Sequence, residues 1–277
     1  MSWLVLAALI AGGVAAVAAL LLARYRKRQA LRRVPRREPS LRHPIVLAHG
    51  VLGFGDIELA GRRHVYFRGV PERLSAMGVE IHRPSVPPLA SVAARAERLA
   101  VAVRALPAEK VNLIAHSMGG LDARYAISRL GLADRVLSLT TIGTPHRGSP
   151  LADLGINLLS LCRRIFKTLD LEVLHDLTGA RMSAFNSEIP DVPTVKYASV
   201  VAWEDRAEMN PLLWASHLYL SERAGPNDGV VPASSQPWGE VWREIRADHW
   251  AQIGWSSGFD APAFYEDLAR KLRDRGF

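Results

Sequence analysis

The stretch Val111–Tyr125, VNLIAHSMGGLDARY, decides the fold class of this chain. Four of its first five residues, VNLIA, are apolar, which is typical of a buried strand in a parallel sheet. A sharp turn follows, and then a segment from Gly119 to Leu130 that predicts a helix. A serine on a turn between a buried strand and a helix is the arrangement of a nucleophile elbow, which needs small residues two positions away. Ala115 and Gly119 meet that need, so we expect Ser117 to be a nucleophile.

Strand-like and helix-like segments alternate on both sides of this turn. Strands are predicted over Pro44–Ala48, Val79–Arg83, Val111–Ala115, Val136–Ile142 and Val241–Arg246, and helices over Pro71–Met77, Val92–Ala105, Gly119–Leu130 and Ala263–Arg275. The alternation predicts a mostly parallel sheet with helices on both faces. Such sheets bind ligands at the carboxyl ends of their strands, so the residues that follow the strands are the candidate site.

The charge distribution argues against a nucleic-acid partner. The chain has 277 residues and a net charge of +8, but residues 1–40 hold eight basic residues and one acidic residue. The rest of the chain carries 27 basic and 26 acidic residues and is therefore electrically balanced. The single cysteine, Cys162, excludes an intramolecular disulfide and a cysteine-based zinc site.

The N-terminus predicts a membrane anchor over residues 1–23. Trp3–Ala23 has no charged residue, and as a helix it would be roughly 31 Å long, close to the hydrocarbon thickness of a bilayer. The basic residues of Arg24–Arg37 all follow this run, which favours a single-pass membrane protein with its catalytic domain on the cytoplasmic side. A cleaved signal peptide is the alternative. A basic linker is expected over residues 24–41 and the folded domain over 42–277.

A catalytic serine needs a base, and the base needs an acid that orients it. In elbow folds the acid and then the histidine follow the serine along the chain. We expect His249 to be the base, because it lies between a predicted strand and the last helix. The other histidines after Ser117 are His146, His175 and His217, and for these we expect packing or structural roles.

Asp228 is the predicted acid, because it lies in PNDGVV, a polar turn before an apolar pair that is typical of a loop at a strand end. An Asp-Gly turn without chemistry is the alternative for this residue. Asp248, Asp191 and Asp205 are the alternative acids. Asp248 is the weakest of these in geometry, because adjacent side chains rarely turn back on one another.

An oxyanion hole needs two backbone N–H groups that point at the developing negative charge. The N–H of Met118 is one candidate, since this residue directly follows the nucleophile. The second is expected from the loop HGVLGFG after the first strand, where Gly50 lets the backbone turn the N–H of Val51 inward. His49 is expected to order this loop by hydrogen bonding, with a catalytic role as the less favoured alternative.

These residues together resemble the bacterial true lipases, the triacylglycerol lipases of the Pseudomonas and Burkholderia type, which belong to the α/β hydrolases. The matching segments extend from residue 43 to 260: HPIVLAHGVLGFGD (His43–Asp56), YFRGVPERLSAMG (Tyr66–Gly78), VNLIAHSMGGLDARY (Val111–Tyr125), TIGTPHRGSPLAD (Thr141–Asp153), FNSEIPDVPTVKYAS (Phe185–Ser199), NDGVVPASS (Asn227–Ser235) and DHW (Asp248–Trp250). The resemblance implies an α/β-hydrolase fold. It assigns the triad Ser117, Asp228 and His249 and the oxyanion donors Val51 and Met118.

The chain departs from the family pattern in three places. Ala115 stands where the family has glycine, which the turn can tolerate. Cys162 has no partner for the disulfide of the secreted members. The family binds calcium through an aspartate two residues after the catalytic histidine, but this position is Ala251, so we predict no metal and no other cofactor. The loop after His249 should instead be held by packing.

The resemblance also places a helical lid at the apolar insertion 150–179. This segment either packs on the core or forms a cap that contacts acyl chains. The sequence thus predicts a membrane-anchored carboxylic-ester hydrolase with lipid esters as substrates and an acyl-enzyme intermediate. An acyltransferase with the same triad and a non-catalytic, membrane-tethered scaffold are the alternatives.

Overall fold

The computed structural model describes residues 41–51, 56–59, 62–161 and 172–277, which belong to one compact unit, Glu38–Phe277. Its centre is a six-stranded sheet with the order β4-β1-β5-β6-β7-β8, and every neighbouring pair of strands is parallel. The strands of this sheet are β1 (Ile45–Ala48), β4 (Ile81–His82), β5 (Val111–His116), β6 (Val136–Ile142), β7 (Lys196–Trp203) and β8 (Glu240–Arg246). A short antiparallel pair, β2 (Asp56–Leu59) and β3 (Arg62–Val65), lies outside the sheet.

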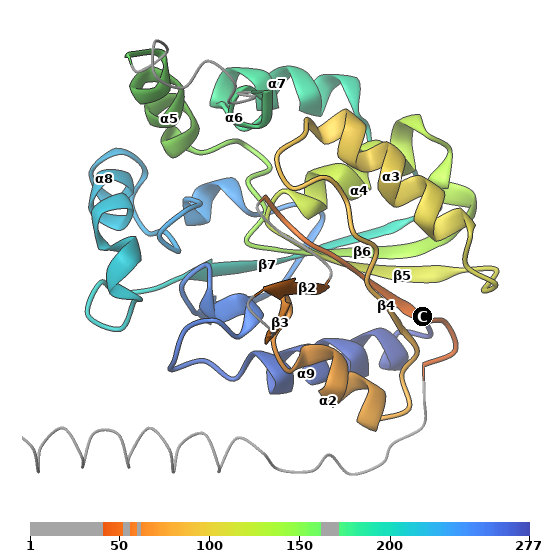
Figure 1. Ribbon diagram of the computed structural model, residues 1–277. Helices are drawn as coiled ribbons and strands as arrows, with labels where there is room; N and C mark the ends of the chain where they lie inside the picture. Colours follow the sequence, from red (N-terminus) through yellow and green to blue (C-terminus); the bar gives the residue numbers. More distant parts are fainter. Residues whose placement is uncertain (1–40, 52–55, 60–61, 162–171) are drawn as a thin grey trace, which may run out of the picture. The chain divides into compact units, whose positions relative to one another are not determined.

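Helices cover both faces of the sheet (Figure 1). They are α2 (Val70–Ala76), α3 (Val92–Arg104), α4 (Gly119–Arg129), α5 (Pro150–Leu161), α6 (Glu172–Asp176), α7 (Gly179–Glu188), α8 (Trp214–Ala224) and α9 (Ala261–Asp274). Helices α3 and α4 pack together on one face, and α2 and α9 pack together on the other. The predicted α/β fold with a mostly parallel sheet is confirmed.

Strand β1 shows why the sequence has an unbroken apolar run here. Successive side chains of a strand point to opposite faces of the sheet. Ile45 and Leu47 belong to the core cluster under α2 and α9, whereas Val46 and Ala48 belong to the cluster under α3 and α4. Because both faces are covered, all four positions are buried and all four must be apolar.

The elements around the elbow lie close to the predicted bounds. β6 spans the predicted residues, and α3 and α4 each end one residue earlier than predicted. The strand predicted over Val79–Arg83 is reduced to the two residues of β4, because only Ile81 and His82 pair with β1. The β2–β3 pair, β7 and α8 were not predicted.

The predicted membrane localisation is corrected. No helix within the described parts of the chain is long and apolar enough to cross a membrane. The prediction of a single-pass membrane protein is therefore not retained. The segment on which it was based, Trp3–Ala23, and the linker up to residue 40 lie outside the described residues.

Candidate active site

Ser117 lies on a turn with an unusual backbone conformation. It directly follows β5, and its φ of 56° is the one positive value among the described non-glycine residues. The serine N–H donates to the carbonyl of Ile142 at 2.9 Å, and the hydroxyl of Thr144 donates to the serine carbonyl at 2.7 Å. Backbone strain of this kind persists where surrounding structure holds it, and such residues cluster at active sites.

Gly50 brings the loop after β1 against the serine. A Cβ at Gly50 would lie 2.6 Å from the Cβ and 3.0 Å from the Oγ of Ser117. No larger residue fits at this position unless the loop moves away from the serine. The loop His49–Val51, called the oxyanion loop below, therefore passes in contact with the predicted nucleophile.

His249 and Asp228 form a direct pair at the same edge of the sheet. Nδ1 of His249 lies 2.8 Å from Oδ2 of Asp228, and the His249 N–H donates to the Asp228 carbonyl at 2.8 Å. Because a carboxylate only accepts hydrogen bonds, Nδ1 carries the proton and Nε2 keeps a free lone pair. This tautomer is the one that a general base requires.

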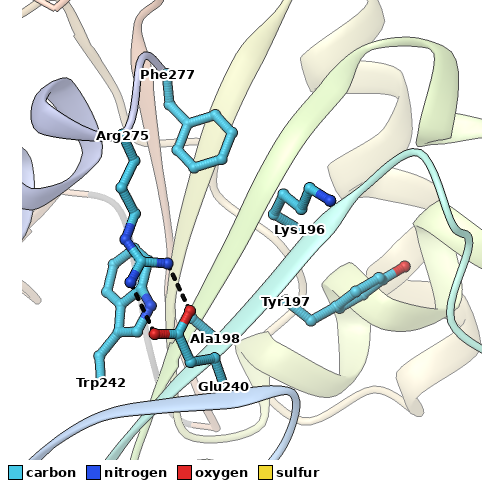
Figure 2. A pocket seen from close by; sticks show the side chains of 7 residues that line it. All are labelled: Lys196, Tyr197, Ala198, Glu240, Trp242, Arg275 and Phe277. Carbon is cyan, nitrogen blue, oxygen red and sulfur yellow. Dashed lines mark hydrogen bonds and ion pairs between the residues drawn. The ribbon is translucent and has the colours of Figure 1, made fainter.

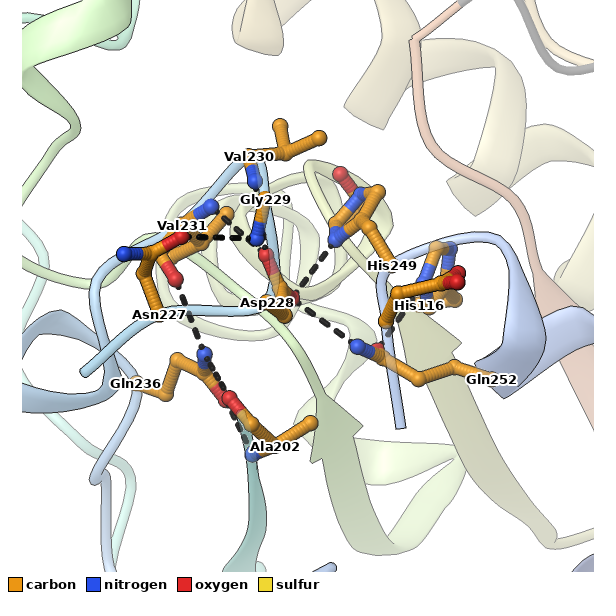
Figure 3. A network of polar contacts seen from close by, with 12 residues as sticks. His116, Ala202, Asn227, Asp228, Gly229, Val230, Val231, Gln236, His249 and Gln252 are labelled. Atoms are coloured by element: carbon orange, nitrogen blue, oxygen red, sulfur yellow. Dashed lines mark hydrogen bonds and ion pairs between the residues drawn. The ribbon is translucent and has the colours of Figure 1, made fainter. Parts of the chain in front are cut away.

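The carboxylate of Asp228 is fully buried and held by further N–H groups (Figure 3). Its Oδ1 accepts the backbone N–H of Val230 at 2.9 Å and that of Val231 at 2.7 Å. Its Oδ2 accepts the side-chain N–H of Gln252 at 2.9 Å as well as the histidine. Such charge-assisted hydrogen bonds fix the orientation of the acid.

The structure brings His249 to the strand that precedes the predicted nucleophile. The centre of its ring is 4.5 Å from the ring of His116, the last residue of β5 and the neighbour of Ser117. Ser117 and His249 thus follow the carboxyl ends of β5 and β8, and Asp228, in the loop after α8, is hydrogen-bonded to His249 at this edge.

The alternative acids have other partners. Asp248 accepts the backbone N–H groups of Trp250 and Ala251 through one oxygen and that of Asn210 through the other. Asp191 accepts the indole N–H of Trp238 at 2.9 Å, and Asp205 forms an exposed ion pair with Arg246. Among these four aspartates, Asp228 is the one hydrogen-bonded to the His249 ring.

The two predicted oxyanion donors belong to the start of α4 and to the oxyanion loop. Met118 is the N-cap of α4, whose first backbone N–H groups have no partners within the helix. The Val51 side chain packs on the buried cluster that contains Met118. The N–H of Gly50 donates to the Tyr66 hydroxyl at 3.1 Å and is therefore engaged, so Val51 stays the predicted donor from this loop.

His49 has the loop-ordering role that the sequence favoured. Its Nε2 accepts the backbone N–H of Val86 at 3.1 Å, so its Nδ1 carries the proton and donates to the Gly50 carbonyl at 3.0 Å. Burial lowers the pKa of His49 to about 4, so the ring is neutral at pH 7. Arg95, which is paired with the buried Asp122, donates to the His49 carbonyl at 2.7 Å.

Sequence reasoning missed three buried side chains next to the triad. Tyr66, His116 and Gln252 connect through hydrogen bonds to one another and to Asp228. Tyr66 and His116 both stood in segments singled out from the sequence, but neither was given a role there, and the polar ring of His116 at the end of a buried strand was the available signal.

The other histidines are engaged elsewhere. His146 is buried against the hydroxyl of Thr141 at 3.1 Å, and the ring of His217 lies 3.2 Å from the carbonyl of Glu204. His175 is exposed on α6. None of these arrangements resembles a base paired with an acid.

Metal ligands do not cluster at this edge. Among the described residues, no group of three or more His, Cys, Asp or Glu side chains could hold a metal ion. The N–H of Ala251 donates to Asp248 at 2.7 Å, and Trp255 donates to the Tyr66 carbonyl at 2.8 Å. The loop after His249 is thus tied by hydrogen bonds as well as by packing.

A cavity of about 460 Å³ lies at the opposite edge of the sheet, where β7 and β8 begin (Figure 2). Its lining contains Lys196, Tyr197, Ala198, Glu240, Trp242, Arg275 and Phe277. This set has no nucleophile paired with a base. The candidate active site is therefore the carboxyl edge.

Comparison with known proteins identifies related hydrolases. Residues 44–161 match the family model described as alpha/beta hydrolase fold. Triacylglycerol lipase 2 of Saccharomyces cerevisiae is 35% identical over 69% of this chain, and the chain spans 63% of its length, a little under two thirds. The triacylglycerol lipase of Vibrio cholerae is 30% identical over 85% of this chain and 89% of its own length.

Solved structures show the same fold. A metagenomic carboxyl esterase has a TM-score of 0.75 at 23% identity and covers 88% of this chain and 79% of its own. The mature lipase of Bacillus licheniformis has a TM-score of 0.67 at 22% identity and covers 87% of this chain and 95% of its own.

Proposed function

Because the chain belongs to the triacylglycerol lipase family of α/β hydrolases, which are carboxylic-ester hydrolases, we propose that it cleaves lipid esters through Ser117, His249 and Asp228. The observation that carries this proposal is the 2.8 Å contact between His249 and Asp228 at the edge where the strained Ser117 lies. A base that is oriented by an acid can activate a weakly nucleophilic hydroxyl, and proton transfer from Ser117 to His249 is part of the proposal.

In the acylation step, Nε2 of His249 takes the hydroxyl proton while Oγ of Ser117 attacks the acyl carbonyl carbon. The carbonyl oxygen becomes an oxyanion and accepts the N–H groups of Val51 and Met118. The tetrahedral intermediate then collapses, the bond to the alcohol oxygen breaks, and the alcohol leaves with the proton from His249. Asp228 keeps the imidazole oriented and stabilises the imidazolium.

In the deacylation step, His249 takes a proton from water, and the hydroxide oxygen attacks the carbonyl carbon of the acyl-serine. The same two N–H groups hold the second oxyanion. Its collapse releases the carboxylic acid, and the proton on Nε2 returns to the oxygen of Ser117. The cycle consumes one ester and one water, and it forms one acid and one alcohol.

We place the acyl chain of the substrate along the apolar side chains beside the oxyanion donors. Val51 and Leu174 are partly buried and offer this apolar surface, and they pack on the buried cluster that contains Met118 and Val173. Val173 belongs to α6, within the segment 150–179 that the sequence interpreted as a lid. The segment as a movable lid stays a prediction, and its residues 162–171 lie outside the described part.

Helix α6 is tied to the body of the domain. The carboxylate of Asp176, its last residue, accepts the N–H of Val92 at the start of α3 at 2.7 Å. This contact favours a fixed position for α6. Its apolar side chains would then line the acyl-chain site, where binding removes hydrocarbon surface of the substrate from water.

The test is ester hydrolysis by the full chain, with p-nitrophenyl butyrate and a tributyrin emulsion as substrates. Ser117→Ala should lower the rate by about 10⁴- to 10⁶-fold, because triad residues act as a unit. Ser187→Ala, at an exposed serine of α7, is the matched control and should keep full activity. Retention of more than a few per cent of the rate by a folded Ser117→Ala would refute the assignment.

A further inference from the structure

A continuous line of polar side chains joins the acid to the oxyanion loop. The amide of Gln252 lies between Asp228 and His116, with Nε2 2.9 Å from Oδ2 of the acid and Oε1 3.1 Å from Nε2 of the histidine (Figure 3). On the other side of the histidine ring, Nδ1 lies 2.8 Å from the Tyr66 hydroxyl. That hydroxyl accepts the N–H of Gly50 at 3.1 Å.

All three linking side chains are buried away from water. Gln252 and His116 have no exposed surface, and Tyr66 is 8% exposed. Buried polar groups are costly unless they are hydrogen-bonded, so each link stabilises its neighbours. The hydrogen bonds of His116 also join distant parts of the chain: Tyr66 is 50 residues away from it, and Gln252 is 136 residues away.

The direction of every hydrogen bond in the line follows from its chemistry. The carboxylate accepts, so Gln252 turns its nitrogen to Asp228 and its oxygen to His116. Nε2 of His116 must then carry the proton. Burial lowers the pKa of His116 well below its ordinary value, so the ring is neutral and its Nδ1 accepts the Tyr66 hydroxyl proton. Tyr66 therefore has its oxygen lone pairs free for the Gly50 N–H.

We propose that Tyr66, His116 and Gln252 are positioning residues. Through this directed line of hydrogen bonds they fix the position of the oxyanion loop relative to the acid, Asp228. Engagement of the Gly50 N–H by Tyr66 leaves the N–H of Val51 to face the oxyanion. The Gln252 amide fixes the same Asp228 oxygen that orients His249. The inference rests on the proposed function and adds the side chains that keep the oxyanion loop and the acid aligned.

The backbone at Gly143 also has a shape that accommodates the Gln252 amide. Gly143 follows β6 with a φ of 57°, and a Cβ at this position would lie 2.3 Å from Oε1 of Gln252. It would also lie 3.2 Å from Oδ2 of Asp228. The backbone thus leaves space where the amide bridges the acid and His116.

The experiment measures kcat and KM for p-nitrophenyl butyrate with full-chain Tyr66→Phe, Gln252→Met and the double variant. Each single change keeps the approximate volume and removes hydrogen bonds. We expect kcat to fall about 10- to 100-fold, the usual effect of losing a buried hydrogen bond next to charge, with KM changed less than about twofold. Titration with a fluorophosphonate counts the competent sites and normalises kcat.

The double variant tests whether the hydrogen bonds of Tyr66 and Gln252 act together as one line or act independently. Because both links act through His116, breaking the second should add little, so the double variant should lose far less than the product of the single losses. Tyr197→Phe is the matched control, since its hydroxyl likewise accepts one backbone N–H, that of Val192, at 3.1 Å. Its kcat should equal that of the original protein.

Three results would overturn the proposal: unchanged kcat in both single variants, a rise in KM at constant kcat, or losses that simply multiply. If one single variant does not fold, the kcat and KM of the other still decide. Ser117→Ala distinguishes failure of the proposed function from failure of the hydrogen-bonded line. An active Ser117→Ala removes the proposed function, whereas an inactive Ser117→Ala beside fully active Tyr66→Phe and Gln252→Met removes the line alone.

Discussion

The two edges of the sheet place polar groups in opposite environments. At the carboxyl edge, Asp228, His116 and Gln252 are buried and satisfy one another by hydrogen bonds. At the amino edge, Glu240 and Arg275 line a cavity but are exposed to solvent. Buried polar side chains cost free energy unless they are paired, whereas solvated ones cost little. The cavity alone therefore does not identify the active site, and the proposed site rests on the satisfied buried network instead.

A shifted pKa is likewise no sufficient sign of function in this molecule. The hydrogen bond from Arg275 lowers the pKa of Glu240 to about 2, although the carboxylate lies in water. Solvent screens such pairs, so their contribution to stability is small. The shift of His116 has another origin, because burial is its largest cause.

The largest effect is expected from the acid of the buried edge. Asp228→Asn should lower kcat by about 10⁴-fold, as expected when the amide no longer holds the required tautomer of His249. The measurement is steady-state ester hydrolysis by the full chain. Asp248→Asn is the matched control, and its effect should fall mainly on stability, because that carboxylate binds backbone N–H groups. A greater kcat loss for Asp248→Asn would exchange the two roles.

Next in size is the close approach of the oxyanion loop to the serine. Gly50→Ala should lower kcat by about 100-fold, because the added Cβ would lie 2.6 Å from Cβ of Ser117 and would displace the loop. Gly179→Ala serves as the control, since its Cβ would meet nothing closer than 3.9 Å. Equal kcat values for the two variants would contradict the contact.

The strand–turn–helix of the elbow could be predicted, and the candidate triad proposed, because local sequence carries both signals. Ser117 stands in a strand–turn–helix pattern, and His249 and Asp228 follow in the required order. The line through Tyr66 and Gln252 could not be predicted, because its hydrogen bonds join distant segments and neither residue type implies a partner.

Local sequence pattern also decides which strands and helices could be predicted. Strand β1 was predictable because both faces are buried and its apolar run is continuous. Strand β8 was also recognised, yet β7, which lies between β6 and β8 in the sheet, was not. Helix α8 is partly exposed and carries a mixed pattern, so its periodicity was weak.

A smaller effect concerns acid stability. The pKa of His49 is about 4 in the folded protein because of burial, and its ordinary value is 6.5. The unfolded chain therefore binds a proton between these values that the folded protein does not, so stability is full above pH 6.5 and falls as pH drops towards 4. His49→Gln should reduce this slope of the unfolding free energy by about 1 kcal/mol per pH unit. Urea unfolding at pH 7, 6 and 5 measures it, and an unchanged slope would contradict a buried neutral ring.

The smallest effect is expected at the exposed edge. Glu240→Gln removes the charge that pairs with Arg275 and should change kcat by less than about twofold, since this edge has no part in the proposed reaction. The assay is the same ester hydrolysis, with thermal unfolding as a second readout. A large loss of kcat in the folded variant would show that the two edges are coupled.

The most direct measurement is the intact mass of the protein after reaction with a fluorophosphonate, followed by peptide mapping. We expect one adduct per chain, on Ser117, and none in Ser117→Ala. We also expect a labelling rate reduced by several orders of magnitude in His249→Ala, because the hydroxyl then lacks its base. An adduct on another residue, or equal labelling of Ser117→Ala, would contradict the central claim that this serine is the nucleophile.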